Sequence, residues 1–255
     1  MILGLEFPPI SHVIEWPAIF GGDGPFSVNK VVILMWISVV LAFGLMYLGG
    51  RKRELVPTGL QNVAESAVDF VEDGIILQTM GPEGLRYMPL LFTLFTFILT
   101  CNIWGLIPVA QMPVNGRIAL PMFMALLVYV IYHVTGIIKQ GPITYLKNIM
   151  FMPGVPKVMY ILLTPIELVT KFISQPLSMA VRLFANMLAG HLLLVSFAVI
   201  TAAVATIGPS LVIFPFSFGL LVFLSTFEVL VAFLQAYIFT ILAAVYIADA
   251  LHPAH

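Results

Sequence analysis

Long runs of apolar residues along the chain predict its helices. One run covers residues 28–49, two more form a predicted helical hairpin over residues 88–138, and two much longer runs cover residues 158–206 and 210–250. Because about 20 apolar residues span a bilayer, each of the first three runs predicts one crossing. Each of the last two could hold two crossings or one long, strongly tilted helix. No polar cluster interrupts them, so the pattern favours a long tilted hairpin over residues 158–250 and about five crossings in all.

Residues 54–86 carry apolar positions at helical spacing beside an acidic face, which predicts an amphipathic helix at the cytoplasmic surface. Helices that bind anionic lipid usually have a basic polar face, so a protein contact is favoured here. Residues 139–157, with Lys139, Lys147 and Lys157, are expected to form a cytoplasmic loop. The whole chain, residues 1–255, is interpreted as a single membrane domain.

The basic residues predict the orientation. No Lys or Arg precedes Lys30, so the first run lacks the basic start of a secretory signal and is interpreted as a retained span. Arg51, Lys52 and Arg53 follow it directly. The positive-inside rule therefore places the N-terminus outside and, after five crossings, the C-terminus in the cytoplasm.

Composition narrows the class of protein. Apolar residues make up 61% of the 255 residues and charged residues 9%, too few charges to cover a water-facing surface. Lys and Arg number 11 against 12 Asp and Glu, so no basic excess points to nucleic acid. The single cysteine, Cys101, excludes a disulfide framework. The expected fold is an all-α polytopic membrane protein, with lipid as its surroundings.

Ionisable residues inside the last hairpin are the candidate functional groups, because an arginine at mid-membrane costs about 2.5–3.5 kcal/mol on insertion scales. They are Glu167, Lys171, Arg182, His191 and Glu228. Helical spacing places Gln175, Ser178, Arg182 and Asn186 on one stripe, and it places Glu228 and Gln235 on one face of the next helix.

His191 lies nine residues after Arg182, on roughly the opposite face and about 13 Å further along the axis. Its distance from the turn at Ile207-Gly208-Pro209 roughly matches that of Glu228, so the two are a candidate proton relay. Purely structural readings stay open: an ion pair between Arg182 and an acid, a buried His191–Glu228 pair, and amides that only join helices. Lys171 and Glu167 are as well explained by contact with lipid headgroups, and His133 by a place at the membrane interface.

Two segments resemble the signatures of subunit a of F-type ATP synthases. They are Pro176-Leu-Ser-Met-Ala-Val-Arg182-Leu-Phe-Ala-Asn186-Met-Leu-Ala-Gly190-His191 and Glu228-Val-Leu-Val-Ala-Phe-Leu-Gln235-Ala-Tyr237-Ile-Phe-Thr240. Many bacterial members have Gly where this chain has Ala185, and carry the His191 and Glu228 residue types in exchanged order. This chain resembles the mitochondrial type in that respect. It also has Gly105 where some members have an acid.

The resemblance implies a stator that faces a ring of c subunits, with b-type peripheral stalk subunits and the remaining ATP synthase subunits as further partners. It implies that Arg182 separates two offset half-channels, with Gln175 and Gln235 accompanying it. By the same resemblance Asn102, Asn186, His191 and Glu228 line the outer half-channel. Glu167 and Ser178, with Ser174 as a further candidate, line the inner one. A bacterial inner membrane is the implied location, with a mitochondrial-type inner membrane as the alternative.

Nothing in the sequence indicates a nucleotide-binding loop of the Gly-x-x-x-x-Gly-Lys-Ser/Thr type, so a non-catalytic subunit without cofactor or metal is expected. The titratable His191 favours protons over sodium as the transported ion. Two rival classes remain. A secondary transporter would usually show internal repeats, and none is visible. A scaffold that only anchors a complex would tolerate loss of Arg182.

Overall fold

The computed structural model describes residues 19, 27–51, 57–107, 113–150, 159–205 and 209–251. Several expectations lie outside these residues: the N-terminal segment, the charges of Lys52, Arg53, Glu54 and Lys157, and the turn residues Ile207 and Gly208.

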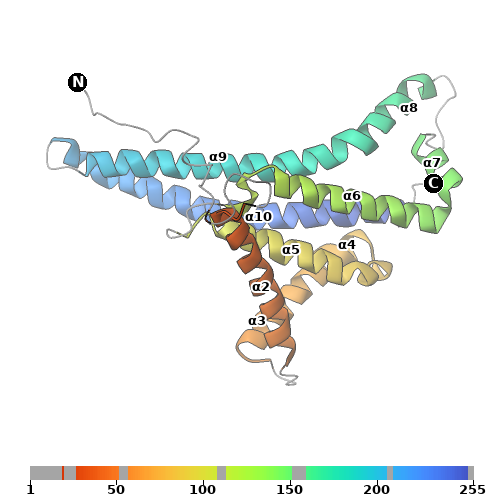
Figure 1. The fold of residues 1–255 in the computed structure, drawn as a ribbon, viewed down its shortest axis with the longest axis horizontal. Coiled ribbons are helices and arrows are strands. Elements are labelled where there is room, and N and C mark those ends of the chain that lie inside the picture. The colour runs from red at the N-terminus through yellow and green to blue at the C-terminus, as the bar shows by residue number, and fades with distance from the viewer. Residues whose placement is uncertain are drawn as a thin grey trace. The chain divides into compact units, whose positions relative to one another are not determined.

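Five helical stretches in the described part of the chain are long and apolar enough to cross a membrane (Figure 1). Three contain α2, Lys30–Arg51, α5, Met88–Ile103, and α6, Ala119–Gln140. The fourth joins α8, Tyr160–Val169, through a π-helical turn, Thr170–Ser174, to α9, Gln175–Val204. The fifth is α10, Phe214–Leu251. The prediction of an all-α polytopic membrane protein with five spans is confirmed.

Each of the two long apolar runs is one continuous helical stretch, as the absence of internal polar clusters predicts. The 38 residues of α10 measure roughly 57 Å at 1.5 Å per residue, against a hydrocarbon core of about 30 Å. A helix of this length must tilt strongly or extend well beyond the core.

The acidic segment is not one helix over residues 54–86. It consists of α3, Leu60–Val71, a π-helical turn, Glu72–Ile76, the short α4, Leu77–Thr79, and a 3₁₀ turn, Pro82–Tyr87. Gly81 has φ 66°, a backbone conformation that favours glycine and ends the helix. Pro82 then starts the next turn. The amphipathic pattern holds, because Ala64, Val71, Ile75 and Ile76 are buried while Glu65, Asp69 and Asp73 are exposed.

The expected loop over residues 139–157 contains a further helix, α7, Pro142–Met150. Gly141 ends α6 with φ 81°, and Pro142 occupies the first turn of α7, where its missing N–H costs nothing. Tyr145 and Ile149, one turn apart, are the buried residues of α7. The three lysines of this segment indicated a loop, and a prediction based on charge alone did not include this short amphipathic helix.

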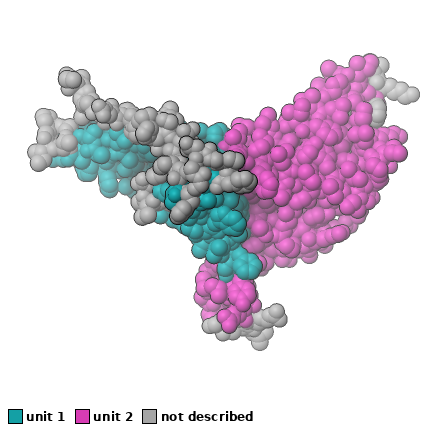
Figure 2. Space-filling model, viewed as in Figure 1, with its two compact units in different colours: residues 1–44, 96–117, 184–236 teal, residues 45–95, 118–183, 237–255 magenta. Residues whose placement is uncertain are grey.

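The chain forms two compact units, which are described separately (Figure 2). Unit 1 comprises residues 1–44, 96–117 and 184–236, and unit 2 comprises residues 45–95, 118–183 and 237–255. The interpretation of the chain as a single membrane domain stays a prediction.

In unit 2, α6 packs beside the C-terminal part of α10. The Gln140 side-chain amide donates to the Ala250 carbonyl at 2.8 Å, and the rings of Tyr132 and Tyr246 lie 5.8 Å apart. Ala243 and Ala244 of α10 are fully buried. Small residues of this kind allow helices in a membrane to approach closely.

Candidate functional site

Unit 1 buries three of the four predicted outer-side residues, Asn102, His191 and Glu228, and also Gln235, which is predicted to accompany Arg182. Glu228 is 7% exposed and His191 is 6% exposed, and Asn102 and Gln235 are buried as well. Glu228 and Gln235 lie on α10, His191 on α9 and Asn102 on α5. A carboxyl group and an imidazole withdrawn from the surface of one unit are a combination that a purely structural core seldom needs.

Glu228 lies directly against Gly190. A Cβ added at Gly190 would be 2.9 Å from Oε1 of Glu228 and 3.3 Å from its Cδ. Oε2 of Glu228 is buried and has no hydrogen-bond partner in the described part of unit 1. Gly190, one residue before His191 on α9, thus leaves the space that the Glu228 carboxyl group of α10 occupies.

No hydrogen bond or ion pair between His191 and Glu228 is found among the described residues. The two side chains are nevertheless buried in the same unit, and the residue preceding His191 is in contact range of Glu228. The relay between them therefore stays a prediction.

Asn102 joins α5 to α10 between Glu228 and Gln235. Its Nδ2 donates to the Ala232 carbonyl at 3.1 Å, and its Oδ1 accepts from Nδ2 of Asn115 at 2.7 Å. Asn115 is fully buried. Asn115 does not stand out in the sequence, because a single amide in a short connection belongs to no helical repeat.

Arg182, Ser178 and Asn186 are exposed along α9, while Met179, Ala180, Leu183 and Met187 are buried on the same helix. Three residues of the predicted stripe are thus exposed on α9, and the fourth, Gln175, is half-buried. Within unit 2 the Arg182 guanidinium forms no ion pair with a described carboxylate, and its charge interacts with the hydroxyl of Tyr246 on α10.

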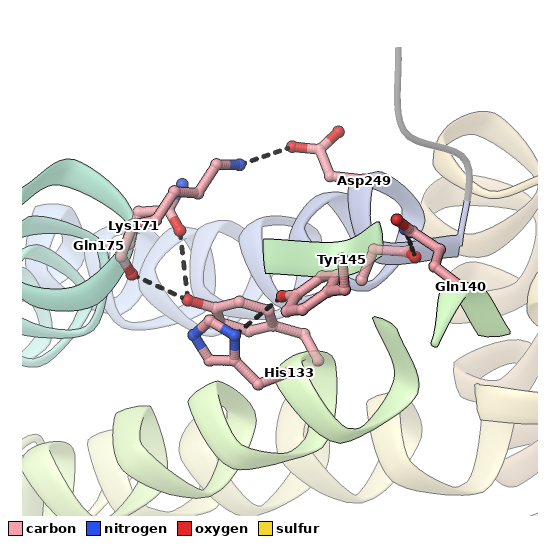
Figure 3. A network of polar contacts seen from close by, with 8 residues as sticks. His133, Gln140, Tyr145, Lys171, Gln175 and Asp249 are labelled. Carbon is pink, nitrogen blue, oxygen red and sulfur yellow. Dashed lines mark hydrogen bonds and ion pairs between the residues drawn. The ribbon is translucent and has the colours of Figure 1, made fainter. Parts of the chain in front are cut away.

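A second polar cluster occupies unit 2 on the side of α6, α7 and the π-helical turn (Figure 3). Lys171 and Asp249 form an ion pair with a distance of 3.6 Å from Nζ to Oδ2. The Tyr132 hydroxyl lies 3.0 Å from the Lys171 carbonyl and 3.4 Å from Oε1 of Gln175. Lys171, which headgroup contact alone could explain, therefore has a specific partner.

His133 has specific partners in unit 2, and its place at the membrane interface stays a prediction. Its Nδ1 is 2.8 Å from the Tyr145 hydroxyl, and its ring stacks on Phe172 with centroids 5.2 Å apart. Burial raises the pKa of Tyr145 to about 12, with the nearby Tyr129 adding to the shift. Tyr145 therefore stays protonated over the physiological range, and the tautomer of His133 decides whether its hydroxyl donates to Nδ1 or accepts from Nδ1–H. The interfacial interpretation overlooked this pair because Tyr145 lies on the unexpected helix α7.

Glu167 and Gln175 lie on either side of the π-helical turn, and both are half-buried. Ser174 and Ser178 are exposed. No side-chain hydrogen bond or ion pair joins Glu167 to the Tyr132–Lys171–Gln175 cluster in the described residues. The sequence singled out Lys171 and Gln175 but not Tyr132, which lies within α6, or Asp249, which lies near the end of α10. No periodic pattern distinguishes these two residues from others on their helices.

These features define a class of protein: a polytopic helical membrane protein with ionisable and amide side chains buried between its long helices and an arginine exposed along one of them. The family described as ATP synthase A chain matches residues 32–248. The chain belongs to that family.

Individual relatives agree. The chain is 41% identical over 246 residues to ATP synthase subunit a of Parafrankia sp., covering 96% of this chain and 83% of the relative. It is 39% identical over 245 residues to that of Rhodococcus erythropolis, covering 92% and 87%. It is 39% identical over 248 residues to that of Mesorhizobium japonicum, covering 96% and 95%.

Proposed function

We propose that this chain is the proton-conducting stator of an ATP synthase membrane sector, with Arg182 separating two offset half-channels that reach carboxylates on a ring of c subunits. The b-type peripheral stalk would hold it against the other subunits of the complex. In this proposal the N-terminus is outside and the C-terminus is in a bacterial cytoplasm.

Arg182 suits this role because of its chemistry. A guanidinium group cannot be deprotonated in a protein, so it cannot pass a proton itself. Its fixed charge favours the ionised form of a ring carboxylate that comes opposite to it. The ring site must then release its proton on one side and bind another from the other side.

The outer half-channel would use the buried groups of unit 1. Glu228 and His191 would transfer protons, and Gly190 would leave room for the Glu228 carboxyl group. Asn102 and the exposed Asn186 would hydrogen-bond water along the path, while Gln235 would accompany Arg182. The inner half-channel would start near Glu167 and Ser178, with Ser174 as a further candidate, and Gln175 would accompany Arg182. Each proton moving through 100 mV would release about 2.3 kcal/mol to turn the ring.

The observation that carries the proposal is the contrast between these groups. The acid and the imidazole are buried inside the chain, whereas Arg182 is exposed on α9 without a carboxylate partner in its own unit. A scaffold has no use for an unpaired arginine in an apolar helix, whereas a stator facing moving carboxylates requires one.

The test is Arg182→Ala, studied in inverted membrane vesicles that contain the whole complex. Two quantities are measured: ATP-driven acidification, and passive proton leak after the catalytic sector is removed. The expected result is loss of acidification with leak retained or raised. Arg86→Ala is the matched control, because Arg86 is exposed in the 3₁₀ turn and belongs to neither cluster.

Normal pumping by Arg182→Ala, with the complex fully assembled, would reduce the chain to a structural anchor. Ion specificity needs a separate measurement. Pumping at fixed pH should not depend on sodium concentration, and a sodium-dependent rate would refute the assignment to protons.

A further inference from the structure

The junction between α8 and α9 leaves one backbone carbonyl without a helical donor. In the π-helical turn the Gln175 N–H bonds to the Thr170 carbonyl, five residues earlier. The next residue, Pro176, has no N–H. In an ordinary α-helix the N–H of residue 175 would donate to the Lys171 carbonyl. Here neither residue 175 nor residue 176 donates a hydrogen bond to it.

Tyr132 of α6 supplies the missing donor. Its hydroxyl donates to the Lys171 carbonyl at 3.0 Å (Figure 3). Tyr132 is only 3% exposed, and its ring packs against the rings of Tyr129 and Tyr246 at centroid distances of 5.5 Å and 5.8 Å. The hydroxyl is thus directed at the turn by a fixed ring, and a buried carbonyl without it would lose a hydrogen bond.

The same hydroxyl lies 3.4 Å from the side-chain amide of Gln175. A phenol has one proton, and the shorter contact takes it. The hydroxyl oxygen can still accept from an amide N–H, and the orientation of a glutamine amide follows from its partners. Tyr132 therefore contacts both the backbone of the π-helical turn and the first residue of the Arg182 stripe.

The turn determines the direction in which Arg182 points. A π-helical turn accommodates one residue more than an α-helix of the same length. Relaxing it to α-helix would rotate α9 relative to α8 by about 100° and shift it by about 1.5 Å. A rotation of that size would turn Arg182 from its present face to another one.

We propose that Tyr132 is a positioning residue for Arg182, because its hydroxyl supplies the hydrogen bond that Pro176 denies to the Lys171 carbonyl and so holds the π-helical turn that orients α9. This inference rests on the proposed function of Arg182.

The first test compares Tyr132→Phe with Tyr129→Phe in the assembled complex. Both variants remove one hydroxyl from α6 and keep the ring, but no hydrogen bond of the Tyr129 hydroxyl is found among the described residues. ATP-driven acidification per assembled complex should fall about two- to tenfold in Tyr132→Phe. This range corresponds to the net free energy of one hydrogen bond. Tyr129→Phe should stay near the wild-type rate.

The second test separates positioning from general support of the fold. Pro176→Ala restores a backbone N–H beside the turn, so in that background the Tyr132 hydroxyl should matter less. The expected effect of adding Tyr132→Phe to Pro176→Ala is below about twofold. If the two losses simply multiply, the hydroxyl does not act through this turn and the proposal is wrong.

The remaining outcomes are also decisive. If Tyr132→Phe does not assemble, recovery of assembly by Pro176→Ala supports the proposal and absence of recovery overturns it. Loss of pumping in Arg182→Ala together with equal rates in the two tyrosine variants overturns this inference alone. Normal pumping in Arg182→Ala overturns the proposed function itself.

Discussion

Gly190→Ala should separate the position of the Glu228 carboxyl group from the stability of the fold. The added Cβ would lie 2.9 Å from Oε1 and 3.3 Å from Cδ of Glu228. A carbon and an oxygen in contact normally stay about 3.3–3.6 Å apart. The carboxyl group must therefore retreat by about 0.4–0.7 Å or adopt another rotamer.

The cost to folding should be small, because the atoms that must move are the end of a flexible side chain. An off-rotamer side chain costs about 0.5–1.5 kcal/mol. Alanine is also favoured over glycine within a helix by about 0.8–1.0 kcal/mol, and Gly190 lies well inside α9. The two contributions roughly cancel, so the amount of assembled complex should be close to that of the wild type.

Function should respond much more strongly than stability. A misplacement of about 1 Å can cost a hundredfold in rate, so a shift of about half an ångström should lower proton transfer through Glu228 roughly tenfold. The assay is ATP-driven acidification of inverted vesicles, normalised to the amount of the chain in the complex. Passive leak through stripped membranes should fall in parallel.

Gly219→Ala is the matched control, because Gly219 lies on α10 with Glu228 and an added Cβ there meets nothing within 4 Å in the described residues. It should pump at the wild-type rate. Wild-type pumping by Gly190→Ala would refute the view that this glycine sets the carboxyl position. Equal losses in both variants would point to a general response to the added methyl group.

Asn102→Ala should destabilise the complex by about 1–3 kcal/mol, because it breaks the bond to the Ala232 carbonyl and leaves the buried Asn115 amide without its acceptor; an unchanged thermal midpoint of the solubilised complex would contradict this. Gly136→Ala should lower the amount of chain in the membrane, because its Cβ would collide with the Tyr145 ring. Normal amounts, measured by quantitative immunoblotting, would show that α7 can move away from α6.

Much of the fold follows from the apolar pattern. Runs of 20 or more apolar residues leave few alternatives to membrane helices, so the five spans and the two continuous long stretches could be predicted. The interruptions depend on single residues. Gly81 and Pro82 divide the acidic segment, and Gly141 and Pro142 start α7 within an expected loop. Sequence-based prediction gave more weight to the charges in these two segments than to these glycines and prolines.

The candidate site divides in the same way. Glu228, His191 and Arg182 stand out because charge inside an apolar run is expensive. Tyr132, Tyr145 and Asn115 do not stand out, since a tyrosine or an amide has many ordinary uses in a membrane helix. Their importance depends on which carbonyl or ring lies opposite, and that depends on the pairing of α6 with the π-helical turn and with α7.

Under the proposed function, another subunit would complete the site of Arg182. In unit 2, Lys171 forms an ion pair with Asp249, and Nζ of Lys139 lies 3.7 Å from Oε2 of Glu83. Arg182 has no such partner among the described carboxylates. At mid-membrane an unpaired arginine would cost about 2.5–3.5 kcal/mol, and it is exposed among apolar neighbours such as Leu177 and Val181. A carboxylate supplied by another subunit would offset that cost only while it is ionised. In the proposed function the arginine would thus bind each passing carboxylate in one protonation state and release it in the other, and this difference would make rotation depend on proton transfer.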